Sequence, residues 1–346
     1  MTIRLTINQV NPEMERINEA AAIIRSGGIV VFPTETVYGI GADAFNADAC
    51  GKIFKVKERP ADNPLMVHIS KLGQLDDVAS DVTDEFMSAA KILWPGPVTF
   101  ILKRNKKVPD VVTAKLDTVA VRMPAHPIAL RLIDASGTAI AAPSANISKK
   151  PSATRAEHVM SDFDGKVDAI IDGGHSAFGL ESTIIDMSKE RPVLLRPGAF
   201  TIEELEKYLG TITIPEYIDR ESESAVAPGM KYRHYAPDKK LVVVSDNSML
   251  LKLGSVKDKI IVLCSDEIAD KIDGKVRTLR LGSEGNLYEI AKNLFDAFRK
   301  IDRMDVELAV VQSFPRRGIG LAIMNRILKA SDSSEVGSIE ELRKYL

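Results

Sequence analysis

Residues 29–44 read IVVFPTETVYGIGADA, and this stretch decides the kind of fold that the chain must have. Residues 29–32 are apolar and typical of a buried strand, which Pro33 ends because proline cannot donate a ladder hydrogen bond. Hydroxyl side chains and the glycines Gly39 and Gly41 follow at once. Loops at strand ends of open α/β sheets are where ligands usually lie. A ligand site at a strand end is therefore one interpretation, and a purely structural turn is the other.

Outward from this stretch, short apolar runs alternate with amphipathic stretches over residues 1–212. Apolar residues at three- and four-residue spacing predict helices over residues 12–26, 47–58 and 84–93. Further strands are expected at residues 65–69, 98–102, 119–121, 139–141, 169–171, 182–186 and 193–195. Many strands with helices between them indicate an α/β sheet of mixed direction.

The pattern breaks over residues 213–238, which have no sustained periodicity, several prolines and an acidic, Ser-containing piece. These features predict a linker. Residues 239–346 return to strand–helix alternation, and we expect a smaller, Rossmann-like α/β domain there. The glycine-rich RRGIGLA of residues 316–322 could bind a phosphate at a helix N-terminus or serve packing alone.

Length and composition place the chain among ordinary globular proteins. Its 346 residues suffice for two domains of roughly 150 residues each. With 45% hydrophobic and 27% charged residues it is not disordered, collagenous or coiled-coil. No apolar run approaches the roughly 18 residues of a membrane span, and the first residues do not resemble a signal peptide. Its two cysteines, far apart in sequence, do not suggest disulfides, so we expect a cytoplasmic protein without membrane contact.

Charge is unevenly spread along the chain. Residues 239–346 carry 19 Lys and Arg against 16 Asp and Glu, whereas residues 1–238 carry 27 against 32. Neither part has the large basic excess of a protein that binds nucleic acid by bulk charge. Any polyanion must therefore be bound by a local cluster of cations.

One such cluster combines Lys52, Lys55 and Arg59, which fall at i, i+3 and i+7 on one face of the helix predicted over residues 47–58 and its exit, with Lys57 two residues before Arg59. A solvated helix face is the ordinary explanation for this spacing. However, the cluster stands in the acidic part of the chain and leads into RPADNP, a stretch typical of an ordered turn. An arginine fork with neighbouring lysines is what triphosphate oxygens need.

Two further strand ends carry polar groups. Arg122 follows the apolar TVAV run, where a charge is costly unless it is paired, either with a structural carboxylate or with a ligand carboxylate. Ser144 and Asn146 follow another apolar run among small residues. The five histidines show no metal-ligand spacing, and no nucleophile motif appears. This inventory suits phosphoryl or nucleotidyl transfer, which relies on positioning and charge neutralisation.

Taken in order, a series of segments resembles the YrdC-like threonylcarbamoyl-AMP synthases. They are FPTETVYGIGADA (32–44), KVKERPADNPL (55–65), WPGPVTF (94–100), VAVRMPAHP (119–127), APSAN (142–146), ESTIID (181–186) and LLRPG (194–198). The segment around KYRHYAP (231–237) and the α/β pattern after it resemble the longer, two-domain form of that family. The resemblance covers essentially the whole chain.

The resemblance implies a fold and an activity. It implies a twisted mixed sheet with helices around a deep cavity, plus the smaller second domain. It also implies an enzyme that condenses L-threonine, bicarbonate or carbon dioxide, and ATP into threonylcarbamoyl-AMP and pyrophosphate, with Mg²⁺ accompanying ATP. A tRNA-modifying transferase complex would then use the product on the adenosine next to the anticodon, and weak direct tRNA contact is conceivable.

Site residues follow by matching positions of the family motifs. Lys57 and Arg59 would be the catalytic pair. ATP would contact Lys55, Arg59, Asn63, Thr118, Ser144, Asn146, Ser152, Arg196, Lys231, His234 and Tyr235. Threonine would contact Thr36, His68, Arg122, Ala142 and Ser182. Lys231, His234 and Tyr235 would fold over the cavity as a lid that excludes water, unless residues 213–238 are only a spacer.

Two other functions remain open from the sequence alone. One is a module that binds tRNA or double-stranded RNA without turnover, although only 5% of the residues are aromatic and offer base-stacking surfaces. The other is a carbamoyl transferase of the hydrogenase-maturation type, whose synthase-like domain resembles this chain. Those proteins carry zinc-finger and acylphosphatase-like segments that this sequence lacks.

Overall fold

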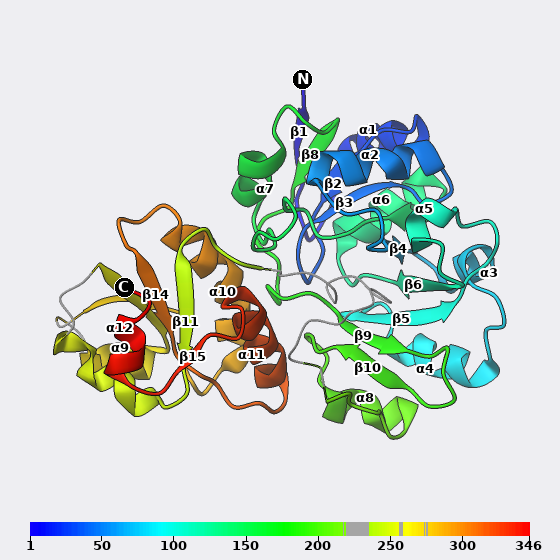
Figure 1. Cartoon of the computed structure of the whole chain (residues 1–346). Coiled ribbons are helices and arrows are strands. Elements are labelled where there is room, and N and C mark those ends of the chain that lie inside the picture. The colour runs from blue at the N-terminus through cyan, green and yellow to red at the C-terminus, as the bar shows by residue number, and fades with distance from the viewer. Residues whose placement is uncertain (217, 219–234, 256–258, 273, 275) are drawn as a thin grey trace.

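The computed structural model describes residues 1–216, 218, 235–255, 259–272, 274 and 276–346. Figure 1 shows two α/β units side by side, which we call the N-terminal part (β1 to α8) and the C-terminal part (β11 to α12). Lys231 and His234, which were predicted to contact ATP, lie outside the described residues. Within the described residues, no helix is long and apolar enough to cross a membrane.

The N-terminal part is built on a ten-stranded sheet in the order β1-β8-β2-β3-β7-β4-β6-β5-β9-β10. Its strands are β1 (Ile3–Thr6), β2 (Val30–Phe32), β3 (Gly39–Asp43), β4 (Met66–His68), β5 (Val98–Lys103), β6 (Thr118–Arg122), β7 (Ile140–Ala141), β8 (Ala169–Asp172), β9 (Thr183–Asp186) and β10 (Val193–Arg196). Parallel pairs such as β4 with β6 stand beside antiparallel pairs such as β5 with β6. The predicted mixed sheet is confirmed.

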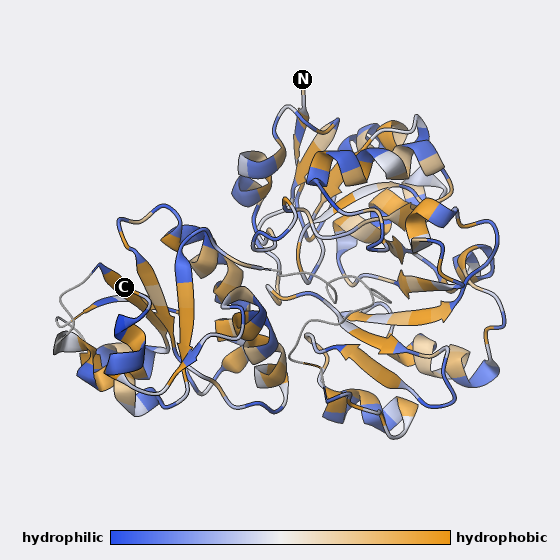
Figure 2. Cartoon of the chain, in the orientation of Figure 1, coloured by the Kyte–Doolittle hydropathy of each residue, from blue (hydrophilic) through white to orange (hydrophobic). Residues whose placement is uncertain are grey.

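Helices pack on both faces of this sheet. They are α1 (Met14–Arg25), α2 (Ala47–Lys57), α3 (Leu75–Val78), α4 (Asp84–Leu93), α5 (Asp110–Thr113), α6 (Pro127–Ser136), α7 (Ala156–Phe163) and α8 (Ile202–Leu209), with a short 3₁₀ turn, η1 (Leu72–Gln74). Local chemistry sets their ends: the Asn46 side chain accepts from the Ala49 amide to begin α2. Figure 2 shows the apolar strands between two-faced helices.

Residues 29–44 contain a second strand where a loop was expected. Residues 39–43 form β3, which pairs antiparallel with β2, so the connecting loop is only residues 33–38. The glycines serve packing: a Cβ at Gly41 would lie 2.6 Å from Ile140 and 2.7 Å from Phe32. Sequence patterns missed β3 because this short strand takes small residues where its neighbours are large.

The C-terminal part has a five-stranded, all-parallel sheet in the order β13-β12-β14-β11-β15. Its elements are β11 (Lys240–Val244), η2 (Asn247–Ser255), β12 (Ile260–Cys264), α9 (Asp266–Ile272), β13 (Arg277–Arg280), α10 (Leu287–Ile301), β14 (Leu308–Val311), α11 (Ile319–Ala330), β15 (Glu335–Val336) and α12 (Ile339–Arg343). Numbered within this part alone, the order is 3-2-4-1-5. The classical dinucleotide-binding sheet begins 3-2-1-4, so the expected Rossmann-like detail is not confirmed.

Helices α10 and α11 cover the face of the small sheet that is turned toward the N-terminal part (Figure 1). Val37 and Leu180 of the N-terminal part lie in the same apolar cluster as these helices. Polar contacts reinforce this junction: Arg299 of α10 pairs with Asp162 at 2.8 Å and donates to the Pro151 carbonyl. The two parts therefore share buried apolar and ionic surface.

The RRGIGLA turn also belongs to this junction. Its Gly318 amide donates to the Glu203 carboxylate of α8 at 3.3 Å. A Cβ at Gly320 would lie 2.0 Å from the Pro315 carbonyl oxygen. Of the two interpretations of this turn, these contacts support packing.

A close backbone approach across the junction can be tested by substitution. Gly179 has φ +70°, and a Cβ there would lie 2.5 Å from backbone atoms of Lys292 in α10. Gly137 has φ +67° with nothing within 4 Å, so Gly137→Ala should cost only backbone strain, about 1 kcal/mol. We expect Gly179→Ala to lower the free energy of unfolding further and to increase hydrogen exchange in α10. Equal losses in the two variants would contradict the close approach.

Candidate active site

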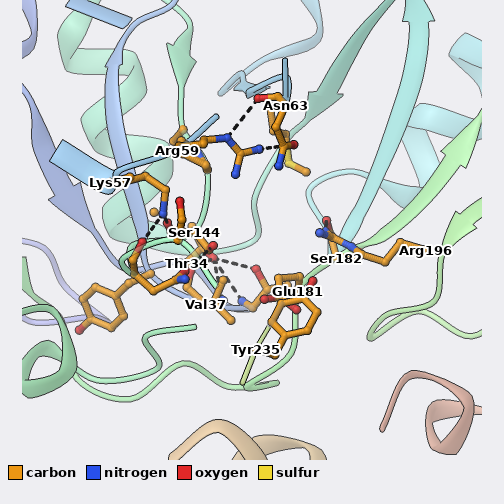
Figure 3. A pocket seen from close by; sticks show the side chains of 18 of the residues that line it. Thr34, Val37, Lys57, Arg59, Asn63, Ser144, Glu181, Ser182, Arg196 and Tyr235 are labelled. Atoms are coloured by element: carbon orange, nitrogen blue, oxygen red, sulfur yellow. Dashed lines mark hydrogen bonds between the residues drawn. The ribbon is translucent and has the colours of Figure 1, made fainter. Parts of the chain in front are cut away.

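A cavity of ≈ 210 Å³ opens in the N-terminal part, where several strand ends and loops converge. Twelve of the residues predicted from sequence line it: Thr36, Lys57, Arg59, Asn63, His68, Arg122, Ala142, Ser144, Asn146, Ser182, Arg196 and Tyr235. In Figure 3, Lys57 and Arg59 lie on one side of the cavity, and Ser182 and Arg196 lie on the opposite side. Residues from distant stretches of sequence are thus brought to one place.

Arg59 reaches the cavity because α2 ends just before it. Glu58 adopts the left-handed conformation, φ 54°, which turns the chain out of the helix. Arg59 then donates from Nε to the Asn63 carbonyl at 3.1 Å and from Nη2 to the Asn63 side chain at 2.6 Å and the Pro64 carbonyl at 2.9 Å. Burial lowers the pKa of Arg59 to about 10, which still leaves it charged at neutral pH. The predicted ordered turn is present, and it fixes the guanidinium.

Lys57 ties the end of α2 to the turn that carries Ser144 and Asn146. Its side chain is 1% exposed, and its Nζ donates to the carbonyls of both residues, at 2.6 Å to Ser144. Burial, followed by repulsion from Arg59, lowers its pKa well below the usual value. The Ser144 hydroxyl donates to the Asn146 side chain at 2.6 Å. The lysine thus also fixes the neighbouring turn that carries Ser144 and Asn146.

Arg122 lies at the end of β6 and makes the structural ion pair that was one of its two interpretations. Its Nη2 lies 2.5 Å from a carboxylate oxygen of Glu35, and both side chains are buried. Its Nη1 donates to the Thr36 hydroxyl at 2.8 Å, and its Nε donates to the Gly96 carbonyl. The sequence argument missed Glu35, although it stands inside the quoted FPTETVYG segment.

His68 is a neutral, buried group on the cavity wall. Burial, with the nearby Arg122 charge, lowers the pKa of its imidazole to about 3. Its ring lies edge-on to Phe32, with centroids 6.2 Å apart. Its Nδ1 is buried and has no hydrogen-bond partner among the residues that the structure describes. An unpartnered polar atom in such a place is suited to a ligand.

Arg196 and Tyr235 complete the wall on the far side. Arg196 donates from Nε and Nη2 to the Ser182 carbonyl, at 3.2 and 3.0 Å, and shares a hydrogen bond with the Tyr235 side chain. The Ser182 hydroxyl in turn lies 2.7 Å from that of Thr99. Tyr235 is buried with φ 67°, and it is the described member of the predicted lid.

Three predicted ATP contacts are not on the cavity wall. Lys55 is exposed on α2. Thr118 lines a separate depression with Asp81 and Lys103. Ser152 is fully buried behind the wall, where its hydroxyl donates to the carboxylate of Glu181.

Glu181 itself is a lining residue that the sequence argument did not single out. It opens the ESTIID segment and is 5% exposed. A carboxylate beside an apolar strand is the signal that could have found it. Among the described residues, no group of three or more His, Cys, Asp or Glu is placed to hold a metal ion.

Two family models together match most of the chain. The Sua5/YciO/YrdC model, described as "telomere recombination", matches residues 22–198, and a model described as "threonylcarbamoyl-AMP synthase, C-terminal domain" matches residues 200–332.

Individual relatives agree with these matches. The threonylcarbamoyl-AMP synthase of Pyrococcus abyssi is 46% identical over 96% of this chain and 98% of its own. That of Bacillus subtilis is 42% identical over 91% and 93%. The crystal structure of P. abyssi Sua5 complexed with L-threonine superposes with a TM-score of 0.90 at 45% identity, covering 97% of this chain and 99% of that one.

The low pKa of His68 predicts a specific dependence of stability on pH. Below about pH 6.5 the unfolded chain takes up a proton that the folded chain refuses until about pH 3. The stability contributed by neutral His68 is therefore lost as the pH falls through this window, by about 2 kcal/mol between about pH 6.5 and about pH 5. We expect His68→Gln to flatten the pH dependence of the unfolding free energy, measured by urea denaturation. An unchanged slope would show that His68 titrates normally.

Proposed function

The chain belongs to the threonylcarbamoyl-AMP synthase family in its two-domain form and is an enzyme that makes an AMP-linked product, and we propose the following substrates and residue roles. The substrates are L-threonine, bicarbonate or carbon dioxide, and ATP. The products are threonylcarbamoyl-AMP and pyrophosphate. The observation that carries the proposal is a cavity with several buried cations inside an otherwise acidic part of the chain.

The nucleotide side of the cavity is assigned to Lys57, Arg59, Asn63, Ser144, Asn146 and Arg196. Arg59 supports this assignment because three hydrogen bonds fix its plane while its Nη1 has no partner among the described residues. A fixed guanidinium with donors to spare is suited to a phosphate oxygen. Lys55, Thr118 and Ser152 remain proposed contacts, which need either a side-chain movement or an indirect role.

The threonine side is assigned to Thr36, His68, Arg122, Ala142 and Ser182. Arg122 would hold the α-carboxylate while Glu35 fixes its guanidinium. Neutral His68 could accept a hydrogen bond from the threonine hydroxyl or donate one to a carbamate oxygen. The P. abyssi relative crystallised with L-threonine supports this choice of amino acid.

The chemistry needs no covalent nucleophile from the protein. Threonine and bicarbonate give the N-carbamate with loss of water. A carbamate oxygen attacks the α-phosphorus of ATP, and the bond to pyrophosphate breaks. Burial raises the pKa of Cys50 and Cys264 to about 12, so neither thiol is suited to act as a nucleophile.

The donors in the cavity suit Mg²⁺ as a companion of ATP rather than as a resident metal. Of the lining carboxylates, Glu181 is already bonded to Ser152 and to Arg326, and Glu58 is exposed. Mg²⁺ commonly binds through substrate phosphates and waters with few protein ligands. When bound, the ion would neutralise charge on the triphosphate, while Arg59 and Arg196 orient it.

We place this reaction before a transfer to tRNA. The product is a mixed anhydride of a carbamate and AMP, so it must be consumed by a transferase before water reaches it. We propose the tRNA-modifying complex that acts next to the anticodon as that consumer, in the cytoplasm. The proposed lid over residues 231–235 would delay hydrolysis, and the burial of Tyr235 supports it.

The substrate set can be tested by measuring pyrophosphate release. We expect the full chain to release pyrophosphate from ATP only when L-threonine and bicarbonate are both present. Serine in place of threonine should give a lower kcat/KM, since it lacks the methyl group. Release that is insensitive to threonine would contradict the proposed reaction.

Arg59→Ala should lower pyrophosphate release by about 100-fold or more, because it removes a fixed donor from the developing phosphate charge. Arg59→Lys should recover only part of the activity, since it keeps the charge and loses the fork. Lys71→Ala, at an exposed ion pair with Asp134, is the matched control that loses a cation elsewhere. If Arg59→Ala retains wild-type turnover with an intact fold, Arg59 is not a catalytic residue.

A further inference from the structure

The C-terminal part reaches the cavity wall through one buried arginine. Arg326, in the middle of α11, has no exposed surface, and its Nε donates to the Glu181 carboxylate at 2.8 Å. Glu181 lines the cavity, 145 residues away in sequence. Its other carboxylate oxygen accepts from Ser152. A residue outside the synthase sheet thus completes the hydrogen bonding of a wall residue.

The same guanidinium supports a second wall residue. It lies over the ring of Tyr235, 5.2 Å from its centroid. Phe295 of α10 also stacks on that ring, with centroids 5.2 Å apart and planes at 30°. Tyr235 therefore has C-terminal-part contacts from both α10 and α11. Figure 3 shows Glu181 and Tyr235 together at one edge of the cavity.

Arg326 matters for the cavity because it balances the negative charge of Glu181. An unpaired buried carboxylate beside the cavity would repel a triphosphate. It would also attract Arg196 away from the phosphates. Among the described residues, Glu181 makes its ion pair with Arg326 and not with Arg196. Burial by itself raises the pKa of Glu181, but Arg326 and then Arg196 hold it below the usual value. The carboxylate is therefore charged and needs a partner.

We propose that Arg326 is a positioning residue for the synthase reaction: by pairing with Glu181 and packing on Tyr235, it keeps the positive charge of Arg196 directed at the phosphates of ATP. This proposal rests on the proposed function. It gives the C-terminal part an indirect role in substrate binding, through residues of the cavity wall. The groups that face Glu181 are Ser152, Arg196, Arg326 and Tyr235.

The test compares the full chain with Arg326→Gln, Arg326→Lys and the double variant Glu181→Gln/Arg326→Gln. Arg326→Gln should raise the KM for ATP about tenfold or more, with a smaller change in kcat, because it leaves Glu181 unpaired. The double variant should recover most of this loss, since it removes both charges together. Arg326→Lys should be intermediate.

A pH profile separates charge from packing. Without Arg326 the pKa of Glu181 should rise, so pyrophosphate release by Arg326→Gln should improve relative to the wild type as pH falls from about 8.5 to about 6. Asp296→Asn is the matched control: it removes a buried charge that faces His158 at 3.1 Å across the junction, without touching the cavity wall. Its KM for ATP should stay close to that of the wild type.

Two results would overturn the proposal. One is a double variant as impaired as Arg326→Gln, and the other is an Asp296→Asn control with the same rise in KM. If the wild type releases no pyrophosphate, the proposed function fails instead. Calorimetric binding of a non-hydrolysable ATP analogue then still decides the role of Arg326, since equal affinities in wild type and Arg326→Gln would reject it.

Discussion

The structure depends on holding several cations in one small cavity without cancelling their charge. Most of the partners that fix them are backbone carbonyls: those of Asn63 and Pro64 for Arg59, Ser144 and Asn146 for Lys57, and Ser182 for Arg196. A carbonyl satisfies a donor and orients it but carries no net charge. Burial is the largest reason that the pKa values of Lys57 and Arg59 are lowered, and repulsion from a neighbouring arginine lowers each further. An anionic ligand would relieve this repulsion.

This arrangement explains why the cavity is formed by strand ends and loops. A carbonyl that is free to accept from a side chain must come from a strand end or a loop, because carbonyls inside helices and sheets are already used. The turn of residues 60–64 after α2, the turn after β7 and the segment before β9 supply these acceptors. The two buried carboxylates that contact this set of side chains are each held by an arginine, Glu35 by Arg122 and Glu181 by Arg326.

Sequence patterns could find the cations but not all their partners. Lys57 and Arg59 stand close together in one segment, and Arg122, Ser144 and Asn146 each follow an apolar run, so local signals reveal them. Glu35 and Arg122 are 87 residues apart, and Glu181 and Arg326 are 145 apart. Local sequence patterns cannot predict that residues so far apart form ion pairs. The mixed sheet followed from strand–helix alternation, whereas β3 and the strand order of the small sheet depend on tertiary packing.

The same charge arrangement argues against the RNA-binding alternative. The cations lie on the wall of a cavity of ≈ 210 Å³, and the part of the chain around them is acidic overall. A nucleic-acid duplex presents phosphates in a long row on a thick helix, so it gains from cations spread over a surface. A single mobile triphosphate can instead bring its charge into the cavity, and the acidic exterior repels the longer polyanion. The distribution of charge thus favours the proposed nucleotide over RNA, in agreement with an enzyme that handles AMP-linked chemistry.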